Sequence, residues 1–219
     1  MIKGLIFDVD GTLIDSIGDI HYCVNLALKE FGFDEVEYDF VKLNTGRGFR
    51  ILIQDCLPQV RDEKLIDEIT KVYSGYYGKH YNEKTKAYDG IHNVLRKLQD
   101  LGIKMGVNSN KKDSYTKDLM STIFPDIKFT AVYGERPGIK NKPDPTTTFE
   151  IIEMMNLQKE EVLYVGDSEV DIRTSKNAGL NSIGCKWGFR GEEILKKENA
   201  TFIIDNPLEI IDIVKEKHE

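Results

Sequence analysis

The sequence is poor in the features that mark a secreted or membrane-spanning protein. Its 219 residues include only three cysteines, Cys23, Cys56 and Cys185, with no CxxC or Cys/His spacing typical of a zinc site. A scattered, odd set of cysteines indicates free thiols in a reducing compartment. The apolar run in MIKGLIFDVDG is too short for a signal peptide, and no apolar stretch approaches membrane-spanning length. We therefore expect a cytoplasmic protein with no membrane partner.

Positive charge is also in the minority. The 30 Lys and Arg residues are outnumbered by 37 Asp and Glu, and the formal net charge is -7. This balance argues against nucleic acid as a partner, and an anionic ligand would need a local site with a metal ion. Hydrophobic residues make up 40% of the chain, which allows a sizeable core in one large domain or two unequal ones. We expect a monomer or a weak homodimer.

Short apolar runs, most of them followed by a helical pattern, recur along the chain. They cover residues 4–7, 104–107, 129–133, 161–165, 180–185 and 201–204. Several are nearly continuous rather than alternating, as expected for parallel strands that are buried on both faces. The alternation of strands and helices predicts an α/β fold with a Rossmann-like, doubly wound parallel sheet.

One segment breaks this rhythm. From residue 16 to about residue 85 the sequence shows helical periods and no convincing strand. At its start, Ser16 and Asp19 resemble a capping box. Its last helical pattern is rich in aromatic side chains, which indicate helix packing rather than a ligand cage: Tyr73, Tyr76, Tyr77 and Tyr81. We expect residues 1–14 and 86–219 to form the core, and residues 15–85 to form an inserted α-helical cap.

Polar residues follow the predicted strands at the positions where ligands bind. In open α/β sheets this position is the crevice outside the carboxyl ends of the strands. Four short segments supply the candidates, namely Asp8 and Asp10, Ser109 and Asn110 in NSNKK, Lys142 in KPDP, and Asp167 and Asp171 in GDSEVD. Two of these segments supply carboxylates, one supplies neutral hydrogen-bonding groups, and one supplies a cation.

The carboxylates predict a magnesium site. Clustered carboxylates raise one another's pKa, so they stay ionised together only beside a counter-charge. Mg²⁺ takes oxygen ligands and typically binds through one or two carboxylates plus a substrate phosphate. Phosphoryl chemistry is therefore the natural hypothesis. The compact ammonium of Lys142 could neutralise the nucleophile and the phosphate on the side away from the metal.

The motifs DVDGTLIDS, NSN, KPDP and GDSEVD occur in the order and spacing of the haloacid dehalogenase-like superfamily. The resemblance covers the whole chain. Within the superfamily the sequence most resembles the phosphoglycolate phosphatase-like branch, through DSIGDIHYCVNLAL, TGRGF, KWGFR and ATFIIDNPLEI. The segment between the first two motifs resembles the helical cap of that branch.

The resemblance implies a role for each motif residue. Asp8 would be the nucleophile that forms an aspartyl-phosphate, and Asp10 would be the general acid and base. Ser109 would bind a phosphoryl oxygen, and Lys142 would orient Asp8. Asp8, the carbonyl of Asp10 and Asp167 would hold Mg²⁺, with Asp171 behind them. Asp10 also favours phosphate over halide chemistry, because dehalogenase-like members need no acid at this position.

The function implied is a Mg²⁺-dependent phosphatase of small, phosphoglycolate-like phosphomonoesters. A sugar-phosphate mutase and a pyrophosphatase use the same fold and remain open. A non-catalytic phospho-aspartate switch is the alternative from another class, and Asp10 together with the cap argues against it.

Several residues have a second interpretation. The segment from Asp8 does not fit a calcium loop, because Leu13 and Asp19 stand where that loop needs Gly and Glu. Ser109 and Asn110 could instead cap a helix. For Asn110, a helix cap and a substrate ligand are equally good interpretations. Lys140 could compete with Lys142. Arg47, in the TGRG segment, is a candidate ligand for a substrate carboxylate or part of a flexible turn.

Overall fold

The computed structural model of the protein describes residues 1–216. Its strands within that range are β1 (Gly4–Phe7), β2 (Ile14–Asp15), β3 (Lys86–Ala87), β4 (Lys104–Lys112), β5 (Ala131–Glu135), β6 (Val162–Gly166), β7 (Asn181–Cys185) and β8 (Phe202–Ile204). Its helices are α1 (Ile17–Glu30), α2 (Tyr38–Asn44), α3 (Phe49–Cys56), α4 (Glu63–His80), α5 (Ile91–Asp100), α6 (Asp113–Ile123), α7 (Thr146–Met155), the 3₁₀ turn η1 (Lys159–Glu161), α8 (Glu169–Ala178), α9 (Glu192–Lys197) and α10 (Glu209–Glu216). None of these helices combines the length and apolar character that crossing a membrane would take.

The main sheet confirms the predicted fold class. Within residues 1–216 it has six parallel strands in the order β5-β4-β1-β6-β7-β8. Counted along the chain within the sheet, this is the 3-2-1-4-5-6 order of doubly wound folds. The direction of winding reverses at β1, so the crevice at its carboxyl end is the expected ligand position.

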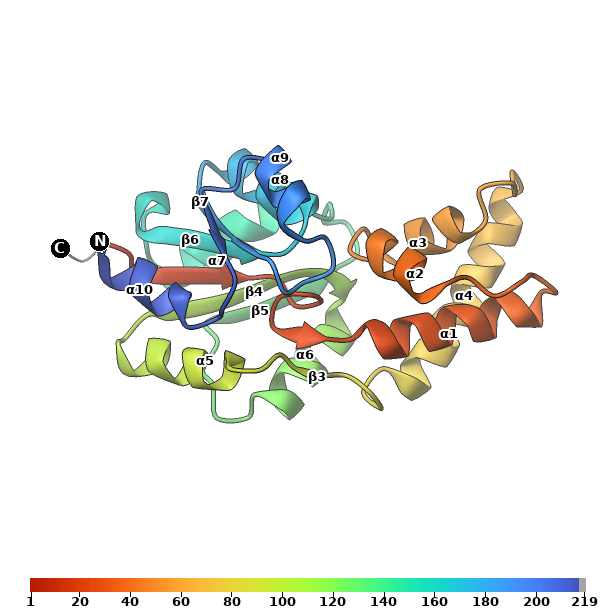
Figure 1. Ribbon diagram of the computed structural model, residues 1–219, viewed down its shortest axis with the longest axis horizontal. Coiled ribbons are helices and arrows are strands. Elements are labelled where there is room, and N and C mark those ends of the chain that lie inside the picture. The colour runs from red at the N-terminus through yellow and green to blue at the C-terminus, as the bar shows by residue number, and fades with distance from the viewer. Residues whose placement is uncertain (217–219) are drawn as a thin grey trace.

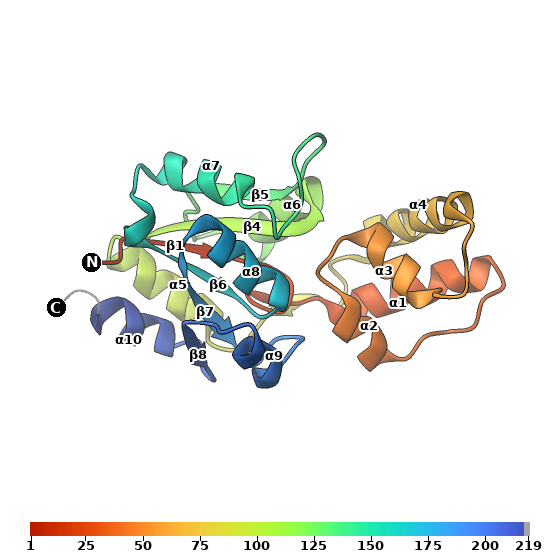
Figure 2. The ribbon, with the colours of Figure 1, turned by 90° about the horizontal axis from the view of Figure 1, so that it is seen from above.

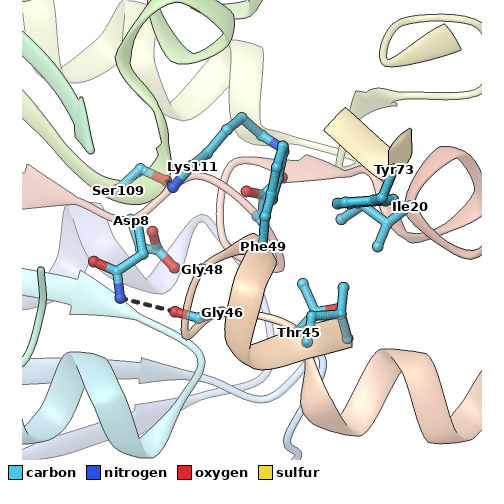
Figure 3. Close-up of a pocket in the computed structure, with 12 residues that line it drawn as sticks. Asp8, Ile20, Thr45, Gly46, Gly48, Phe49, Tyr73, Ser109 and Lys111 are labelled. Carbon is cyan, nitrogen blue, oxygen red and sulfur yellow. Dashed lines mark hydrogen bonds and ion pairs between the residues drawn. The ribbon is translucent and has the colours of Figure 1, made fainter. Parts of the chain in front are cut away.

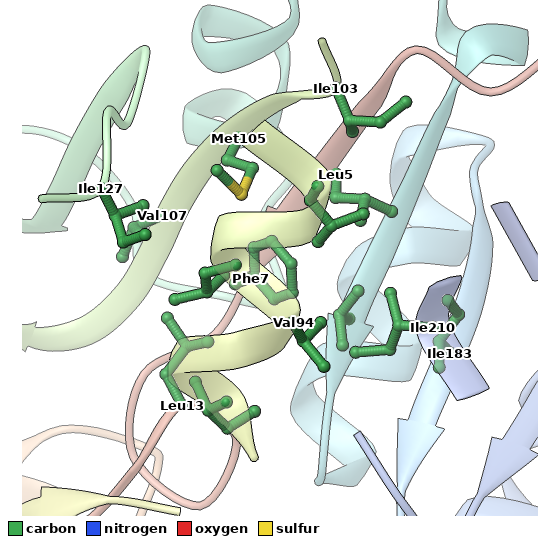
Figure 4. Packing of buried hydrophobic residues seen from close by; sticks show 14 of the residues in the cluster. Leu5, Phe7, Leu13, Val94, Ile103, Met105, Val107, Ile127, Ile183 and Ile210 are labelled. Atoms are coloured by element: carbon green, nitrogen blue, oxygen red, sulfur yellow. The ribbon is translucent and has the colours of Figure 1, made fainter. Parts of the chain in front are cut away.

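The central strand β1 is buried on both faces, which explains its continuous apolar sequence. Leu5 and Phe7 pack in one cluster with α5, α6 and α10, while Ile6 packs in another with α7 and α8. Figure 4 shows Leu5 and Phe7 against Val94 of α5 and Met105 of β4. Figure 1 shows α5 and α10 on one side of the sheet and α8 on the other. The three cysteines are buried free thiols, as predicted.

The helices α1–α4 form a separate body at one end of the sheet. Figure 2 shows them beyond the carboxyl end of β1, away from the N-terminus. They share their own hydrophobic cluster, which includes Ile20, Ile53 and Tyr73. Two chain segments connect this body to the sheet, and there β2 and β3 pair antiparallel, Ile14 with Ala87. The sequence did not predict this short ribbon.

Two predicted details of the local structure are wrong. The strand expected at 104–107 continues as β4 to Lys112, because its polar residues still pair with β5 after an irregularity in register. Ser109 and Asn110 therefore lie in a strand, and α6 begins only at Asp113. The capping box at Ser16 is absent, since the Ser16 side chain makes no capping hydrogen bond. The side chain of Asp19 instead accepts bonds from Lys84 and Thr85, where the chain leaves α4.

Candidate active site

Asp8 and Asp10 lie immediately after β1, at the carboxyl edge of the sheet. The Asp8 amide donates to the carbonyl of Val165 at 2.9 Å, which holds Asp8 beside the end of β6. Gly11 follows with a φ of +88°, and a Cβ there would lie 2.4 Å from Oδ2 of Asp167. Glycine is required for both reasons, because other residues rarely adopt this conformation and none would leave room for the carboxylate.

Lys142 is buried between two carboxylates. Its Nζ lies 2.7 Å from Oδ1 of Asp8 and 2.7 Å from Oδ1 of Asp171. Asp171 also accepts bonds on Oδ2 from the backbone and side chain of Ser168, so it completes a capping box at the start of α8. Asp171 therefore has two tasks, since it caps helix α8 and holds Lys142 beside Asp8.

Three carboxylates converge on this point. Ligand oxygens of Asp8, Asp167 and Asp171 lie within 4.8 Å of one another, and all three residues are buried. Oδ2 of Asp167 accepts a hydrogen bond of 2.6 Å from the Phe189 amide. Within residues 1–216, no donor lies on the second oxygen of Asp8. Among the described residues, Lys142 is the cation that contacts this cluster, so direct contact offsets one of the three negative charges when all three acids are ionised.

The pKa values reflect this excess of negative charge. Burial, reinforced by Asp171, raises the pKa of Asp8 well above its usual range, although Lys142 opposes the effect. Burial and Asp171 also raise the pKa of Asp167 to about 7. Burial lowers the pKa of Lys142, but Asp171 and Asp8 outweigh it and raise that pKa well above its usual value. Lys142 therefore stays charged, while the acids lack a further cation.

A divalent cation fits this donor set. The cluster offers carboxylate oxygens, the ligands that Mg²⁺ prefers, and its uncompensated charge matches that of one divalent ion. Asp8 and Asp167 are the available ligands, because Asp171 is held by Lys142 and Ser168. The side chain of Asp10 is not part of this cluster of three carboxylates.

Asp10 has a separate set of contacts. Its Oδ1 lies 3.0 Å from Nζ of Lys111 and accepts a hydrogen bond from the Ser16 hydroxyl. Nζ of Lys111 also donates to the Tyr77 hydroxyl at 2.5 Å, and so connects the end of β4 to helix α4. Two donors therefore orient the Asp10 carboxylate independently of Lys142 and the acid cluster.

Asp8 and Asp10 both line a partly open cavity of about 30 Å³ between the sheet and helices α1–α4. The core side also contributes Ser109, Asn110 and Lys111. The helical side contributes Ile20, Thr45, Gly46, Gly48, Phe49, Leu52 and Tyr73. Figure 3 shows Ile20 and Tyr73 across the cavity from Asp8 and Ser109. A phosphate ester in this cavity would have its phosphorus beside the carboxylates and its organic part beside the helices.

The two neutral residues near the end of β4, Ser109 and Asn110, differ in what they can offer a ligand. The Ser109 oxygen accepts a bond of 3.1 Å from the Lys111 amide, so its own O–H is free to donate into the cavity. The Asn110 amide nitrogen donates to the carbonyls of Gly46 and Lys142, and its oxygen accepts from the Lys142 amide. The dashed line at Gly46 in Figure 3 marks the first of these bonds. Asn110 thus holds the Lys142 loop and contacts the helical segment, with little capacity left for substrate.

Two other candidates lie apart from the cluster. Arg47 does not line the cavity, because its guanidinium donates to Asp55 at 2.6 Å and to Asn44 at 3.3 Å. In this conformation it cannot reach a substrate beside Asp8. Lys140 is exposed, whereas Lys142 is buried in the cluster, so the structure favours Lys142 in the competition between the two.

Lys111 and Ser16 are site residues that sequence reasoning missed. Lys111 belongs to a Lys-Lys pair after polar residues, a pattern that usually marks a solvated turn. The alternation of side chains along a strand would have indicated it, since Ser109 and Lys111 share one face of β4. Ser16 has the sequence of a helix cap, and only the turn at Gly11 brings Asp10 within its reach.

Replacing Lys142 with Met is expected to lower the free energy of unfolding of the metal-free protein by about 3–5 kcal/mol. The reason is that Asp8 and Asp171 would be left buried without their common counter-charge. Urea denaturation at pH 8 in chelator measures this. Lys140→Met, two residues away and exposed, is the control, with an expected effect below about 0.5 kcal/mol. Equal effects of the two substitutions would contradict this assignment of Lys142.

Sequence and structure comparisons agree with this geometry. A sequence model of the family described as haloacid dehalogenase-like hydrolase matches residues 5–185. The chain belongs to the haloacid dehalogenase-like hydrolase family. Its relatives in the family include a phosphoglycolate phosphatase of Aquifex aeolicus, 30% identical over 210 residues that cover 96% of this chain and 95% of the relative. A second phosphoglycolate phosphatase, from Vibrio parahaemolyticus, is 27% identical over an alignment that covers 97% of this chain and 96% of the relative.

A crystal structure from Lactobacillus delbrueckii subsp. bulgaricus has the same fold. It superimposes with a TM-score of 0.89 and 28% sequence identity, over 97% of this chain and 98% of the other. The haloacid dehalogenase-like fold, with its inserted helices, therefore extends over nearly the whole chain.

Proposed function

We propose that this hydrolase is a Mg²⁺-dependent phosphatase that cleaves small, phosphoglycolate-like phosphomonoesters through an aspartyl-phosphate on Asp8. The observation that carries the proposal is the position of Asp8. One carboxylate oxygen is held at 2.7 Å by Lys142, and the residue lines a small, partly open cavity together with Asp10 and Ser109. A fixed and partly neutralised carboxylate that faces a cavity is suited to attack on phosphorus.

Each residue has a task that its contacts support. Asp8 attacks phosphorus, and the P–O bond to the alcohol breaks. Asp10, oriented by Lys111 and Ser16, gives a proton to the departing alkoxide and then takes one from the water that attacks the phosphorylated Asp8. The free O–H of Ser109 donates to a phosphoryl oxygen, and Lys142 compensates negative charge.

Mg²⁺ is the cation we propose for the acid cluster, held by Asp8, Asp167 and the carbonyl of Asp10. When bound, it would compensate the negative charge of the carboxylates and the phosphoryl group. Asp171 supports the site from behind through Lys142. Gly11 and Gly188 leave the space that the Asp167 carboxylate occupies, since a Cβ on either would lie within 2.5 Å of it.

We further propose that residues 1–14 and 86–219 act as the catalytic core and residues 15–85 as a cap. The ribbon of β2 and β3 connects the two and is the natural place for a hinge. A cavity of about 30 Å³ holds about two water molecules, so a substrate must enter with the cap raised. Closure then removes bulk water from the reacting atoms. A cytoplasmic monomer or weak homodimer remains our prediction for the state of the protein in the cell.

A phosphate-release screen tests the proposal. We expect the protein to hydrolyse small phosphomonoesters with Mg²⁺ and to lose nearly all turnover in chelator, because the acid cluster would then lack its cation. The screen should include 2-phosphoglycolate, a sugar phosphate and pyrophosphate.

The same screen separates the alternatives. Isomerised sugar phosphate in place of free phosphate would indicate a mutase, and turnover of pyrophosphate alone would indicate a pyrophosphatase. A stable phosphoprotein without turnover would indicate a switch. Full activity in chelator would contradict the metal requirement.

A further inference from the structure

Tyr73 carries a buried hydroxyl without a hydrogen-bond partner among the described residues. It lies on α4, and its side chain lines the cavity that contains Asp8 and Asp10. The other tyrosines of this helix and of the turn after it all have partners, namely Glu30 for Tyr76, Lys111 for Tyr77 and Asp118 for Tyr81. Tyr73 is therefore the exception in this aromatic group.

Packing explains the ring of Tyr73 but not its hydroxyl. The ring makes an edge contact with Phe49, with centroids 4.7 Å apart, and is fully buried in the hydrophobic cluster of the helices. Phenylalanine would make the same contacts. A buried hydroxyl without a partner costs about 1–3 kcal/mol of stability. Such a group in a cavity wall indicates a partner that arrives with the ligand.

The rest of the helical wall has little to offer a polar ligand. Its side chains at the cavity are mainly apolar: Ile20, Phe49 and Leu52. The hydroxyl of Thr45 already donates to the carbonyl of Val41 at 2.8 Å. Arg47 is paired with Asp55 outside the cavity. Nε of Arg47 is also buried without a partner, but Arg47 does not line the cavity, so among the described residues that do line this wall Tyr73 carries the unpaired side-chain donor.

The groups that would bind the phosphoryl part all belong to the sheet. Asp8 lies directly after β1, Ser109 lies near the end of β4, and Lys142 lies in the loop that leads to α7. A donor on α4, across the cavity, therefore faces the organic part of the substrate. Burial raises the pKa of Tyr73 well above its usual value, so the hydroxyl stays protonated and keeps a proton to donate to an acceptor.

The small cavity limits the length of that organic part. About 30 Å³ is available with the helices in this position. Each additional carbon requires the helices to stand further from the sheet, which moves the Tyr73 hydroxyl away from an acceptor near the phosphorylated carbon.

From these observations we infer that Tyr73 selects the substrate by donating a hydrogen bond to an acceptor oxygen on the organic part of a short phosphomonoester. This inference rests on the proposed phosphatase function and adds a substrate class to it. The ligand has a phosphoryl group at one end and a carboxylate or carbonyl oxygen at the other.

The test compares Tyr73→Phe with the unmodified protein on 2-phosphoglycolate and on ethyl phosphate, which has the same carbon number and no acceptor. On 2-phosphoglycolate we expect kcat/KM to fall by roughly 10- to 100-fold, the loss typical of a hydrogen bond to a charged group. On ethyl phosphate we expect less than about a 3-fold change. The melting temperature should not fall, because no protein hydrogen bond is lost.

Tyr76→Phe is the matched control, since it removes a hydroxyl from the same helix that is bonded to Glu30 outside the cavity. Tyr76→Phe should leave kcat/KM unchanged on both substrates. Equal losses by Tyr73→Phe on both substrates, no loss on either, or a clear drop in its melting temperature would overturn the role of Tyr73 and leave the phosphatase function standing. Failure of the unmodified protein on every phosphomonoester would overturn both.

Discussion

Asp8→Asn is expected to lower kcat on every phosphomonoester substrate by roughly 10³-fold or more, because an amide cannot serve as the nucleophile. The substitution keeps the shape of the side chain. Lys142 would retain its contact with Asp171, so the fold should survive. Steady-state phosphate release measures the loss. Mass spectrometry of acid-quenched protein should detect a phosphorylated Asp8 in the unmodified enzyme and none in the variant.

Asp212→Asn is the control for Asp8→Asn. Asp212 is an exposed residue of α10, remote from the carboxyl end of the sheet, and its replacement should leave kcat unchanged. Substantial turnover by a well-folded Asp8→Asn protein would exclude covalent catalysis by this carboxylate. A phosphorylated peptide from another part of the chain would do the same.

Asp10→Asn should have the second largest effect, and its size should depend on the leaving group. With alkyl phosphates we expect kcat/KM to fall by about 10²- to 10⁴-fold, the usual contribution of a general acid. With p-nitrophenyl phosphate the loss in phosphoenzyme formation should be much smaller, because that leaving group departs without a proton. The contacts of Asp10 support this role, since Lys111 and Ser16 orient its carboxylate at the cavity that also contains Asp8.

Rapid-quench measurement of phosphoenzyme formation on the two substrates gives this difference directly. The comparison is its own control, since a misfolded variant would lose activity on both substrates alike. A loss that is equal for alkyl and p-nitrophenyl phosphate would show that Asp10 positions the site without transferring a proton. Lys111→Met should leave the nucleophile intact while weakening the orientation of Asp10.

The parallel core could be predicted because its signals are local. The run 4–7 is apolar at every position, since β1 is covered on both faces, and the acidic residues follow where the strand ends. The motif spacing then placed Asp8, Lys142 and Asp167 at neighbouring strand ends, and in the structure they do converge. The metal and catalytic roles of these residues remain predictions.

The two predictions of local structure that were wrong depend on hydrogen bonds to residues far away in the sequence. Ser16 had the sequence of a helix cap, but the turn after β1 brings Asp10 closer than the helix amides. The polar residues after 107 resembled a loop, yet pairing with β5 extends the strand to Lys112. No local pattern reports such competition, because it is decided by hydrogen bonds between segments that meet only in the folded chain.

The sequence by itself determined the sheet, the inserted helices and the set of carboxylates at the strand ends, because strand length, hydrophobic pattern and turn glycines act over a few residues. Only the tertiary structure decided how those groups are paired. It pairs Lys142 with Asp8 and Asp171, Lys111 with Asp10 and Tyr77, and Arg47 with Asp55. Among the described residues it leaves the Tyr73 hydroxyl without a hydrogen-bond partner. The burial and pairing of these side chains depend on how helices α1–α4 pack against the sheet. That packing depends on the whole chain and not on any local segment.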